Sequence, residues 1–368
     1  MLSDDLTITS GGLTITGWTD IRVTRGIERL PSDFTIGMTE LYATEFDKLV
    51  IEPGAACRVT LGEDPVVTGY IDHVVPSIGP ADHSIQVNGR SKCSDLVDCA
   101  AEWAGGQISN ATVLEVAQKL AAVYGPRPSG VPEGIAVATN VSSFLLPIIP
   151  QTNIMLGESP FDIIERMARF SAVLAYDLPD GSLFLSRVGT RQLDSGVAEG
   201  VNVQRAYIDY SADLNYSTYD VYLQSTDLFM DAGTSGNLKF TASDINCKRH
   251  RRMVIIAESG SMGLDIAEKR AIWESVRRFG RSRVVKVIVD SWRDLSGTLW
   301  EPNTLVPVSL PRLKLPSALL LISEVTFQRN DYSGTTAELT LMAPEAFTPQ
   351  PINLTPLWGD VPWGNYGQ

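Results

Sequence analysis

The chain has 368 residues, of which 44% are hydrophobic and 20% charged, so it is long enough for two or three globular domains and is not a disordered protein. A formal net charge of −13 argues against a protein that coats nucleic acid. The four cysteines have no CxxC spacing and there are only three histidines, which excludes the usual zinc patterns.

The most apolar run, Val141–Ile149, is broken by serines and a proline, and it is far shorter than the roughly 20 residues of a membrane helix. The acidic start of the chain lacks the order of a signal peptide. We therefore expect no membrane segment and no cleaved leader. Thirty glycines and 21 prolines indicate many turns and a β-rich fold.

Four regions follow along the chain. Residues 1–92 alternate apolar and polar side chains in about six short runs, which predicts a small antiparallel β-barrel or sandwich. Residues 93–198 mix helical and strand patterns and form a predicted α+β domain, with helix starts at Thr112 and Ser159. Residues 199–345 return to the strand period, with one helix over 264–280 that is predicted to end at Gly280.

The last region, residues 346–368, is rich in proline and glycine and has too few apolar residues for a core of its own. We interpret it as an extended tail whose aromatic side chains dock on a partner, and the alternative is a disordered end. The candidate docking residues are Trp358, Trp363 and Tyr366.

Positive charge is concentrated in residues 248–286, which hold 11 Lys and Arg against 4 Asp and Glu. A basic face on one copy can meet an acidic face on the next, so this segment is a candidate subunit interface. The alternative is a solvated helix face. The candidate residues are Lys248, Arg249, Arg251, Arg252, Arg277, Arg278, Arg281 and Arg283. On this hypothesis, reversing Arg277 and Arg278 to Glu should block assembly without unfolding the chain.

Catalytic patterns are missing from the sequence. None of His73, His83 and His250 lies beside a nucleophile-elbow pattern, and no GxSxG, P-loop or HExxH motif occurs. We therefore predict no enzyme, no cofactor and no metal site. Two alternatives stay open: a β-rich hydrolase of cell-wall polysaccharide, or a carbohydrate-binding module in which Trp18, Trp292 and Trp300 stack on sugars. Their strand-like neighbours favour core packing for these tryptophans.

Seven segments of the sequence have a recognisable order along the chain: Gly17–Glu28, Val67–Asp72, Val87–Lys92, Asp95–Ala101, Leu114–Tyr124, Ser159–Phe170 and Asn215–Val221. In this order they resemble the baseplate hub protein family of Mu-type contractile phages. The resemblance is dense over residues 1–125 and collinear to about residue 345, but it does not extend to 126–157 or to the tail.

The resemblance implies a mainly β fold with two small tube-like β-barrel domains per chain, around a helical α+β domain. It implies a homotrimer whose six barrels form a pseudo-sixfold ring between a sixfold tail tube and a threefold central spike. The implied partners are the spike, the tail tube protein, other baseplate and wedge proteins, and DNA that passes through without specific binding. The implied location is the tail baseplate of the virion, assembled in the host cytoplasm. A related contractile injection machine would have the same architecture.

Overall fold

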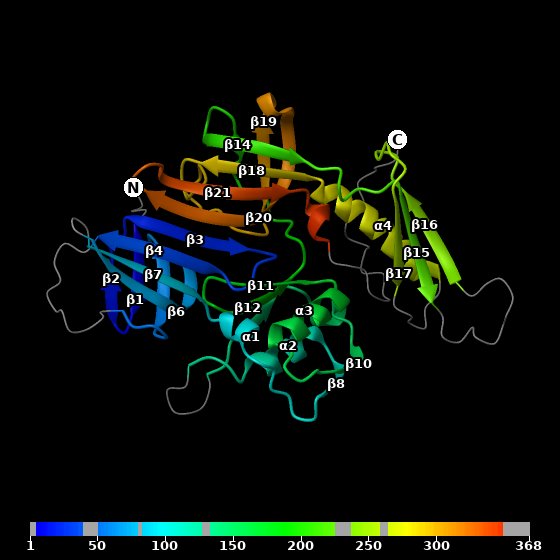
Figure 1. The fold of residues 1–368 in the computed structure, drawn as a ribbon, viewed down its shortest axis with the longest axis horizontal. Coiled ribbons are helices and arrows are strands. Elements are labelled where there is room, and N and C mark those ends of the chain that lie inside the picture. Colours follow the sequence, from blue (N-terminus) through cyan, green and yellow to red (C-terminus); the bar gives the residue numbers. More distant parts are fainter. Residues whose placement is uncertain are drawn as a thin grey trace.

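The computed structural model describes residues 5–39, 51–79, 83–126, 133–224, 237–257 and 264–348. Most of these residues lie in strands, so the predicted mainly β class with an α+β part is confirmed. The chain builds two β units, a middle region that packs beneath them and an appended sheet with a long helix (Figure 1).

The N-terminal β unit contains the first seven strands. These are β1 (Leu6–Ser10), β2 (Leu13–Ile15), β3 (Asp20–Gly26), β4 (Asp33–Thr39), β5 (Ala56–Leu61), β6 (Asp64–Ile78) and β7 (His83–Ser91). The β5–β6 pair is an antiparallel hairpin that turns at Gly62, which has a φ of +62°. Alternate side chains are buried in β5 and over residues 67–71 of β6, as the period of two predicts.

The middle region follows without a break. It contains α1 (Ser94–Asp98), β8 (Gln107–Ala111), α2 (Val113–Ala121), β9 (Val137–Thr139), β10 (Ile149–Asn153), α3 (Pro160–Phe170), β11 (Leu174–Asp177) and β12 (Leu183–Ser186). Both predicted helix starts are confirmed, because Thr112 and Ser159 are N-caps of complete capping boxes. β11 and β12 form an antiparallel hairpin. The apolar faces of α2 and α3 form a separate core here.

The C-terminal β unit contains β13 (Val197–Ala198), β14 (Val203–Tyr210), β18 (Arg283–Val289), β19 (Leu305–Leu310), β20 (Leu315–Asn330) and β21 (Gly334–Met342). Between β14 and β18 lies an appended region of β15 (Thr218–Gln224), β16 (Asn237–Ser243), β17 (Arg252–Ala257) and α4 (Leu264–Arg281). In Figure 1 this region stands to the right of both β units, with α4 against its three-stranded sheet.

The two β units are one continuous sheet. Among the described residues it has 13 strands, and β3 of the first unit pairs with β20 of the second (Figure 1). A single apolar core runs under both units and includes Phe34, Val59, Val287 and Leu339. Such shared burial removes apolar surface from water across the junction, which favours a rigid connection between the two units.

Two expectations are corrected here. Gly280 does not end its helix: α4 continues to Arg281, and a Cβ at Gly280 would lie 2.7 Å from the amide nitrogen of Ala346. The glycine therefore serves close packing against the short helical turn Pro344–Phe347. The three tryptophans Trp18, Trp292 and Trp300 are all buried in the shared core, which contradicts a role in stacking on sugars.

Candidate assembly interface

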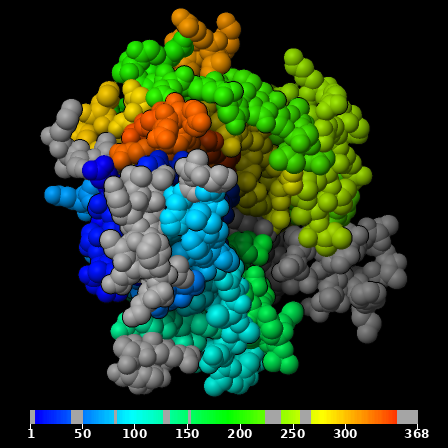
Figure 2. All heavy atoms as spheres, turned by 60° about the vertical axis from the view of Figure 1, so that its left-hand side comes forward, coloured from blue at the N-terminus to red at the C-terminus, as the bar shows by residue number. Residues whose placement is uncertain are grey.

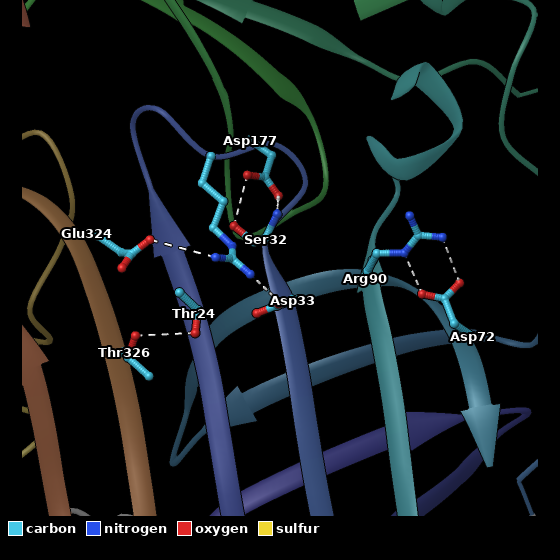
Figure 3. A network of polar contacts seen from close by, with 9 residues as sticks. Thr24, Ser32, Asp33, Asp72, Arg90, Asp177, Glu324 and Thr326 are labelled. Atoms are coloured by element: carbon cyan, nitrogen blue, oxygen red, sulfur yellow. Dashed lines mark hydrogen bonds and ion pairs between the residues drawn. The ribbon is translucent and has the colours of Figure 1, made fainter. Parts of the chain in front are cut away.

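The junction between the two units is an antiparallel strand pair. Residues Ile21–Gly26 of β3 face Glu324–Arg329 of β20 over six consecutive pairs. The hydroxyls of Thr24 and Thr326 lie 3.3 Å apart across it (Figure 3). Arg29 forms an ion pair with Asp33 and lies 3.8 Å from the carboxylate of Glu324. The outer half of β20 thus has a partner on both edges, β21 and β3.

Asp177 of β11 ties the middle region to this junction. Its carboxylate accepts hydrogen bonds from the backbone amide and the hydroxyl of Ser32, at 3.0 and 2.9 Å (Figure 3). The neighbouring guanidinium of Arg25 is buried, and burial lowers its pKa, while the charges of Asp177 and Glu301 act in the opposite direction. Asp177 therefore both satisfies Ser32 and supplies negative charge near a buried cation.

The two β units have the same strand order. In the first, the neighbours run β3-β4-β7-β6-β5, and in the second β14-β18-β21-β20-β19. Each unit contains a meander of three consecutive strands, β5-β6-β7 or β19-β20-β21. Two strands from earlier in the chain, β3 and β4 or β14 and β18, continue the sheet beyond the third strand of the meander. All these pairings are antiparallel.

The likeness extends to single residues. Each long strand has a register shift at its ninth residue, between Ile71 and His73 in β6 and between Ile322 and Glu324 in β20. The Ile71 amide donates to Ala55 at 3.0 Å while its carbonyl accepts from Gly54 at 2.7 Å, and Ile322 makes the same two bonds with Thr304 and Asn303, both at 2.9 Å.

Gly54 and Asn303 also share a left-handed backbone, with φ of +83° and +63°. Glycine and asparagine are the residues that adopt this conformation most readily. No repeat is visible between the two halves of the sequence, so the equivalence of the units follows from the strand pairing and from these matched local features.

The predicted basic residues on α4 are held within the chain. Arg277 and Arg281 both pair with Glu28 in the turn between β3 and β4. Arg278 donates to the buried carboxylate of Glu274 at 2.9 Å. Reversing Arg278 to Glu would place two carboxylates together at a buried site, so we expect the Arg277 and Arg278 reversal to destabilise the chain. The role of these residues in an interface stays a prediction.

Of the other candidate basic residues, three have side-chain partners among the described residues and two do not. Arg251 donates to the carbonyls of Ala212 and Asp213 at 3.0 and 2.6 Å, and Arg252 pairs with Asp220. Arg283, at the start of β18, lies over the ring of Tyr210. Lys248 and Arg249 are exposed, and within the described part of the chain no ion pair is recorded for either. These two are the candidate residues with charge free for another molecule.

Asp220 is the buried anchor of the β15–β17 sheet. Burial raises its pKa, but hydrogen bonds from Thr241, Lys239 and Arg252 outweigh burial and lower the pKa to about 2. The carboxylate therefore contributes stability above the ordinary Asp pKa of 3.8, and this contribution is lost as the pH falls through about 2.

An Asp220→Asn variant is expected to be less stable than the native chain by about 1–3 kcal/mol at neutral pH, because Lys239 and Arg252 lose a charged acceptor. Urea unfolding between pH 5 and pH 2 should show the difference shrinking as the native carboxylate is protonated. A difference that stays constant over this range would contradict the assignment.

A hollow of about 480 Å³ lies between the N-terminal β unit and the middle region. Arg90 on its wall binds Asp72 through Nε and Nη2 at 2.6 and 3.2 Å, and Asp98 through Nη2 at 2.8 Å (Figure 3 shows the Asp72 pair). These hydrogen bonds raise the pKa of Arg90. Arg90 therefore links β7 to β6 and to α1 through its two carboxylate partners at the wall of this hollow.

Neither a metal site nor a membrane helix is found among the described residues. Within the described ranges, no group of three or more His, Cys, Asp or Glu could hold a metal ion. Among the helices described, none is long and apolar enough to cross a membrane. Trp358, Trp363 and Tyr366 lie outside the described residues.

Two exposed strand edges were missed in the sequence. Among the described residues, β14 pairs only with β18, and the outer half of β6, residues 73–78, pairs only with β7. Both edges carry exposed apolar side chains: Val75, Ile78, Tyr207 and Tyr210. The signal available in the sequence is the proline Pro76 inside a strand pattern, because proline in a sheet is confined to edges and bulges.

Three segments of the chain match known families of phage baseplate domains. Residues 5–91 match the N-terminal domain model described as Mu phage baseplate assembly protein GpP-like, residues 93–187 match the second domain of baseplate hub protein gp44-like, and residues 264–350 match the fourth domain of the Mu phage protein GpP.

Whole-chain relatives agree. The chain is 31% identical to the baseplate hub protein gp44 of Escherichia phage Mu, over 94% of this chain and 89% of that protein. The crystal structure of the 43 kDa tail protein of prophage MuSo2 from Shewanella oneidensis has a TM-score of 0.80 and 30% identity, covering 93% of this chain and 99% of the other. A tail protein from Neisseria meningitidis has a TM-score of 0.76 at 20% identity, covering 94% and 98%. On the strength of its identity to gp44 along nearly its whole length, the chain belongs to the Mu-type phage baseplate hub family.

Proposed function

We propose that this protein is the structural hub of a phage tail baseplate, located in the virion, where three copies form a ring. The observation that carries the proposal is the repeated strand order: one chain holds two units with the same topology, and β3 of the N-terminal unit pairs with β20 of the C-terminal unit. Three chains then supply six similar units, which lets a threefold spike meet a sixfold tube.

The internal junction supports a ring rather than a two-fold pair. β3 offers one surface and β20 offers a different one, so the contact is heterologous. Heterologous contacts, repeated by a rotation that closes, generate rings. If the contact between neighbouring chains repeats the one inside the chain, units alternate around the ring and every strand edge at the junctions is paired.

The proposed partners are a central spike protein, the tail tube protein and other baseplate or wedge proteins, with DNA passing through during ejection. The net charge of −13 supports passage without adhesion, because like charges repel the phosphate backbone. We propose no enzymatic activity and no cofactor, since the relatives are baseplate hub proteins. The divisions at residues 92, 198 and 345 are kept as proposed domain boundaries, and the tail as a proposed docking segment.

The test is the oligomeric state of the purified chain, alone and mixed with a central spike protein. Mass photometry is expected to show three chains per particle, and electron micrographs to show a ring with a pseudo-sixfold outline. Chains that stay monomeric with the spike present, or rings with another number of subunits, would contradict the proposal. Zymography on peptidoglycan tests the hydrolase alternative, and lysis by the purified chain would support it.

The exposed basic loop gives a sharper prediction. Lys248→Glu combined with Arg249→Glu is expected to weaken binding to a neighbouring chain or to the tube protein at least tenfold, because two favourable charges become unfavourable. Co-sedimentation with tube protein and mass photometry measure it. Lys314→Glu, on the exposed turn before β20, is the matched control that should assemble normally. Equal assembly of both variants would remove this loop from the interface.

A further inference from the structure

Two strand edges of the described chain lack a partner in the very places where the internal junction has one. One edge of β20 pairs with β19 before the register shift and with β3 after it. β6 likewise pairs with β5 up to Tyr70, but beyond its own register shift the corresponding edge, residues 73–78, faces no strand among the described residues. The equivalent of β3 in the second unit is β14, whose outer edge is also unpaired there.

We propose that β14 of one chain pairs antiparallel with residues 73–78 of β6 in the neighbouring chain, repeating between chains the β3–β20 contact within the chain. This rests on the proposed ring and specifies its interface. In Figure 2 the green segment that contains β14 lies along the upper rim of the face in view, next to the orange strands of its own unit.

The exposure of the two edges agrees with a missing partner. Val75 and Ile78 on β6 are 48% and 85% exposed, and Tyr207 and Tyr210 on β14 are 50% and 58% exposed. In contrast, the counterpart of Val75 in β20 is Thr326, which is only 7% exposed next to β3, and the counterpart of the exposed Pro76 is the fully buried Phe327. Exposed apolar strand edges invite pairing with another chain, so a soluble protein retains them where an interface needs them.

The internal repeat also fixes the register. In each unit, residues that pair across adjacent strands form a row perpendicular to the strands. One row of the first unit contains Arg22, Thr35, Asn88 and His73, and the equivalent row of the second contains Tyr207, Lys286, Thr340 and Glu324. Tyr207 is therefore the counterpart of Arg22, and Ser77 the counterpart of Gln328. Since Arg22 faces Gln328 in the junction, Tyr207 of one chain is predicted to face Ser77 of the next.

The alternation of backbone hydrogen bonds along β14 matches that along β3. Ser211 donates to Ser282 at 2.8 Å, so alternate residues of β14, Ala206, Ile208 and Tyr210, direct their backbone groups to the open edge. Their counterparts in β3 are Ile21, Val23 and Arg25. Ile27, in phase with these, donates to Ser323 of β20 at 2.9 Å, as the repeat requires.

The predicted register brings apolar side chains together. Ala206 would face Ile78, Ile208 would face Pro76, and Tyr210 would face Val74. Ala206, Ile208 and Val74 already border the shared core, so pairing would extend that core between chains. Pro76 has no amide hydrogen to donate, which removes one hydrogen bond from the ladder and also discourages indiscriminate pairing of this edge.

The test is a disulfide between chains. Ser77→Cys with Tyr207→Cys is made in a background of Cys99→Ser and Cys247→Ser, which removes the two cysteines that are not buried. Tyr207 and Ser77 would be a non-hydrogen-bonded antiparallel pair, in which the side chains approach closely enough for a disulfide. Ser77→Cys with Ile208→Cys is the control, because the neighbouring residue points to the opposite face of the strand.

Mild oxidation is expected to give linked dimers and trimers on non-reducing gels for the 77–207 pair and at least tenfold less product for the 77–208 pair, with dithiothreitol reversing it. Trimers in mass photometry without the 77–207 link would overturn this pairing and leave the hub standing. A link in chains that form no trimer would support the pairing and overturn the ring. Neither link nor trimer would overturn both.

A second variant tests the same strand pairing without cysteines. Ile78→Lys places a charge on the open edge and is expected to reduce trimer formation at least tenfold, because burying an unpaired charge at an interface is costly. Ile245→Lys, at a site that is 93% exposed between β16 and β17, is the control that should form trimers normally. Normal trimers from Ile78→Lys would contradict the pairing.

Discussion

Replacing Phe327 with alanine is expected to lower the free energy of unfolding by about 3–5 kcal/mol. Phe327 is fully buried in β20, faces Val23 across the junction, and packs edge-on against Trp292 with 6.5 Å between ring centroids. Its loss opens a cavity under the contact between the two β units, which neither unit can close by itself. Urea unfolding followed by tryptophan fluorescence measures the change, since Trp292 reports directly on the site.

The control for this variant is Val75→Ala, in the outer half of β6 that corresponds to the outer half of β20. Val75 is half exposed, so the isolated chain should lose no more than about 0.5 kcal/mol. A small effect of Phe327→Ala, close to that of Val75→Ala, would show that the two units do not depend on each other for stability.

Replacing Asp177 with alanine is expected to cost about 3–5 kcal/mol of unfolding free energy as well. The change leaves the amide and hydroxyl of Ser32 without their acceptor and removes a negative charge near the buried guanidinium of Arg25. Because Asp177 belongs to β11, we expect the middle region to loosen from the junction first. Limited proteolysis together with urea unfolding would detect this.

Asp177→Asn separates the two contributions, since the amide oxygen still accepts from Ser32 but the charge is lost. Its destabilisation should fall between the native chain and Asp177→Ala. Asp180→Ala is the matched control, because Asp180 caps only the local turn through Ser182. A loss for Asp180→Ala equal to that for Asp177→Ala would contradict a special role for the junction.

Local features of the fold were predictable because their causes lie close together in the sequence. Thr112 with Glu115 defines a capping box, Gly62 permits the β5–β6 turn, and the apolar spacing from Leu264 onward defines α4. Gly280 misled the prediction of the end of α4. A glycine near the end of a helix suggests a stop, whereas here close contact with Ala346, 66 residues later in the chain, explains it.

The junction and the repeat were not predictable from one sequence. β3 meets β20 across some 300 residues, and strand alternation in either one is compatible with many partners. Equivalent positions such as Gly54 and Asn303 share a backbone conformation but not a residue type. A count of charges also did not reveal that Arg277, Arg278 and Arg281 have partners inside the chain.

The connections between equivalent strands differ greatly in length in the two units, and this difference affects where the protein can accept insertions. In the first unit the turn from β3 to β4 spans only residues 27–32 and is held by Ser32 and Glu28, while the equivalent connection in the second unit houses the whole β15–β17 sheet and α4. The entropy of closing a connection grows slowly with its length, so the second site tolerates grafted modules at small thermodynamic cost. Lineages of this architecture therefore have one turn at which new appendages can be gained and exchanged, and another at which an insertion would pull apart the scaffold.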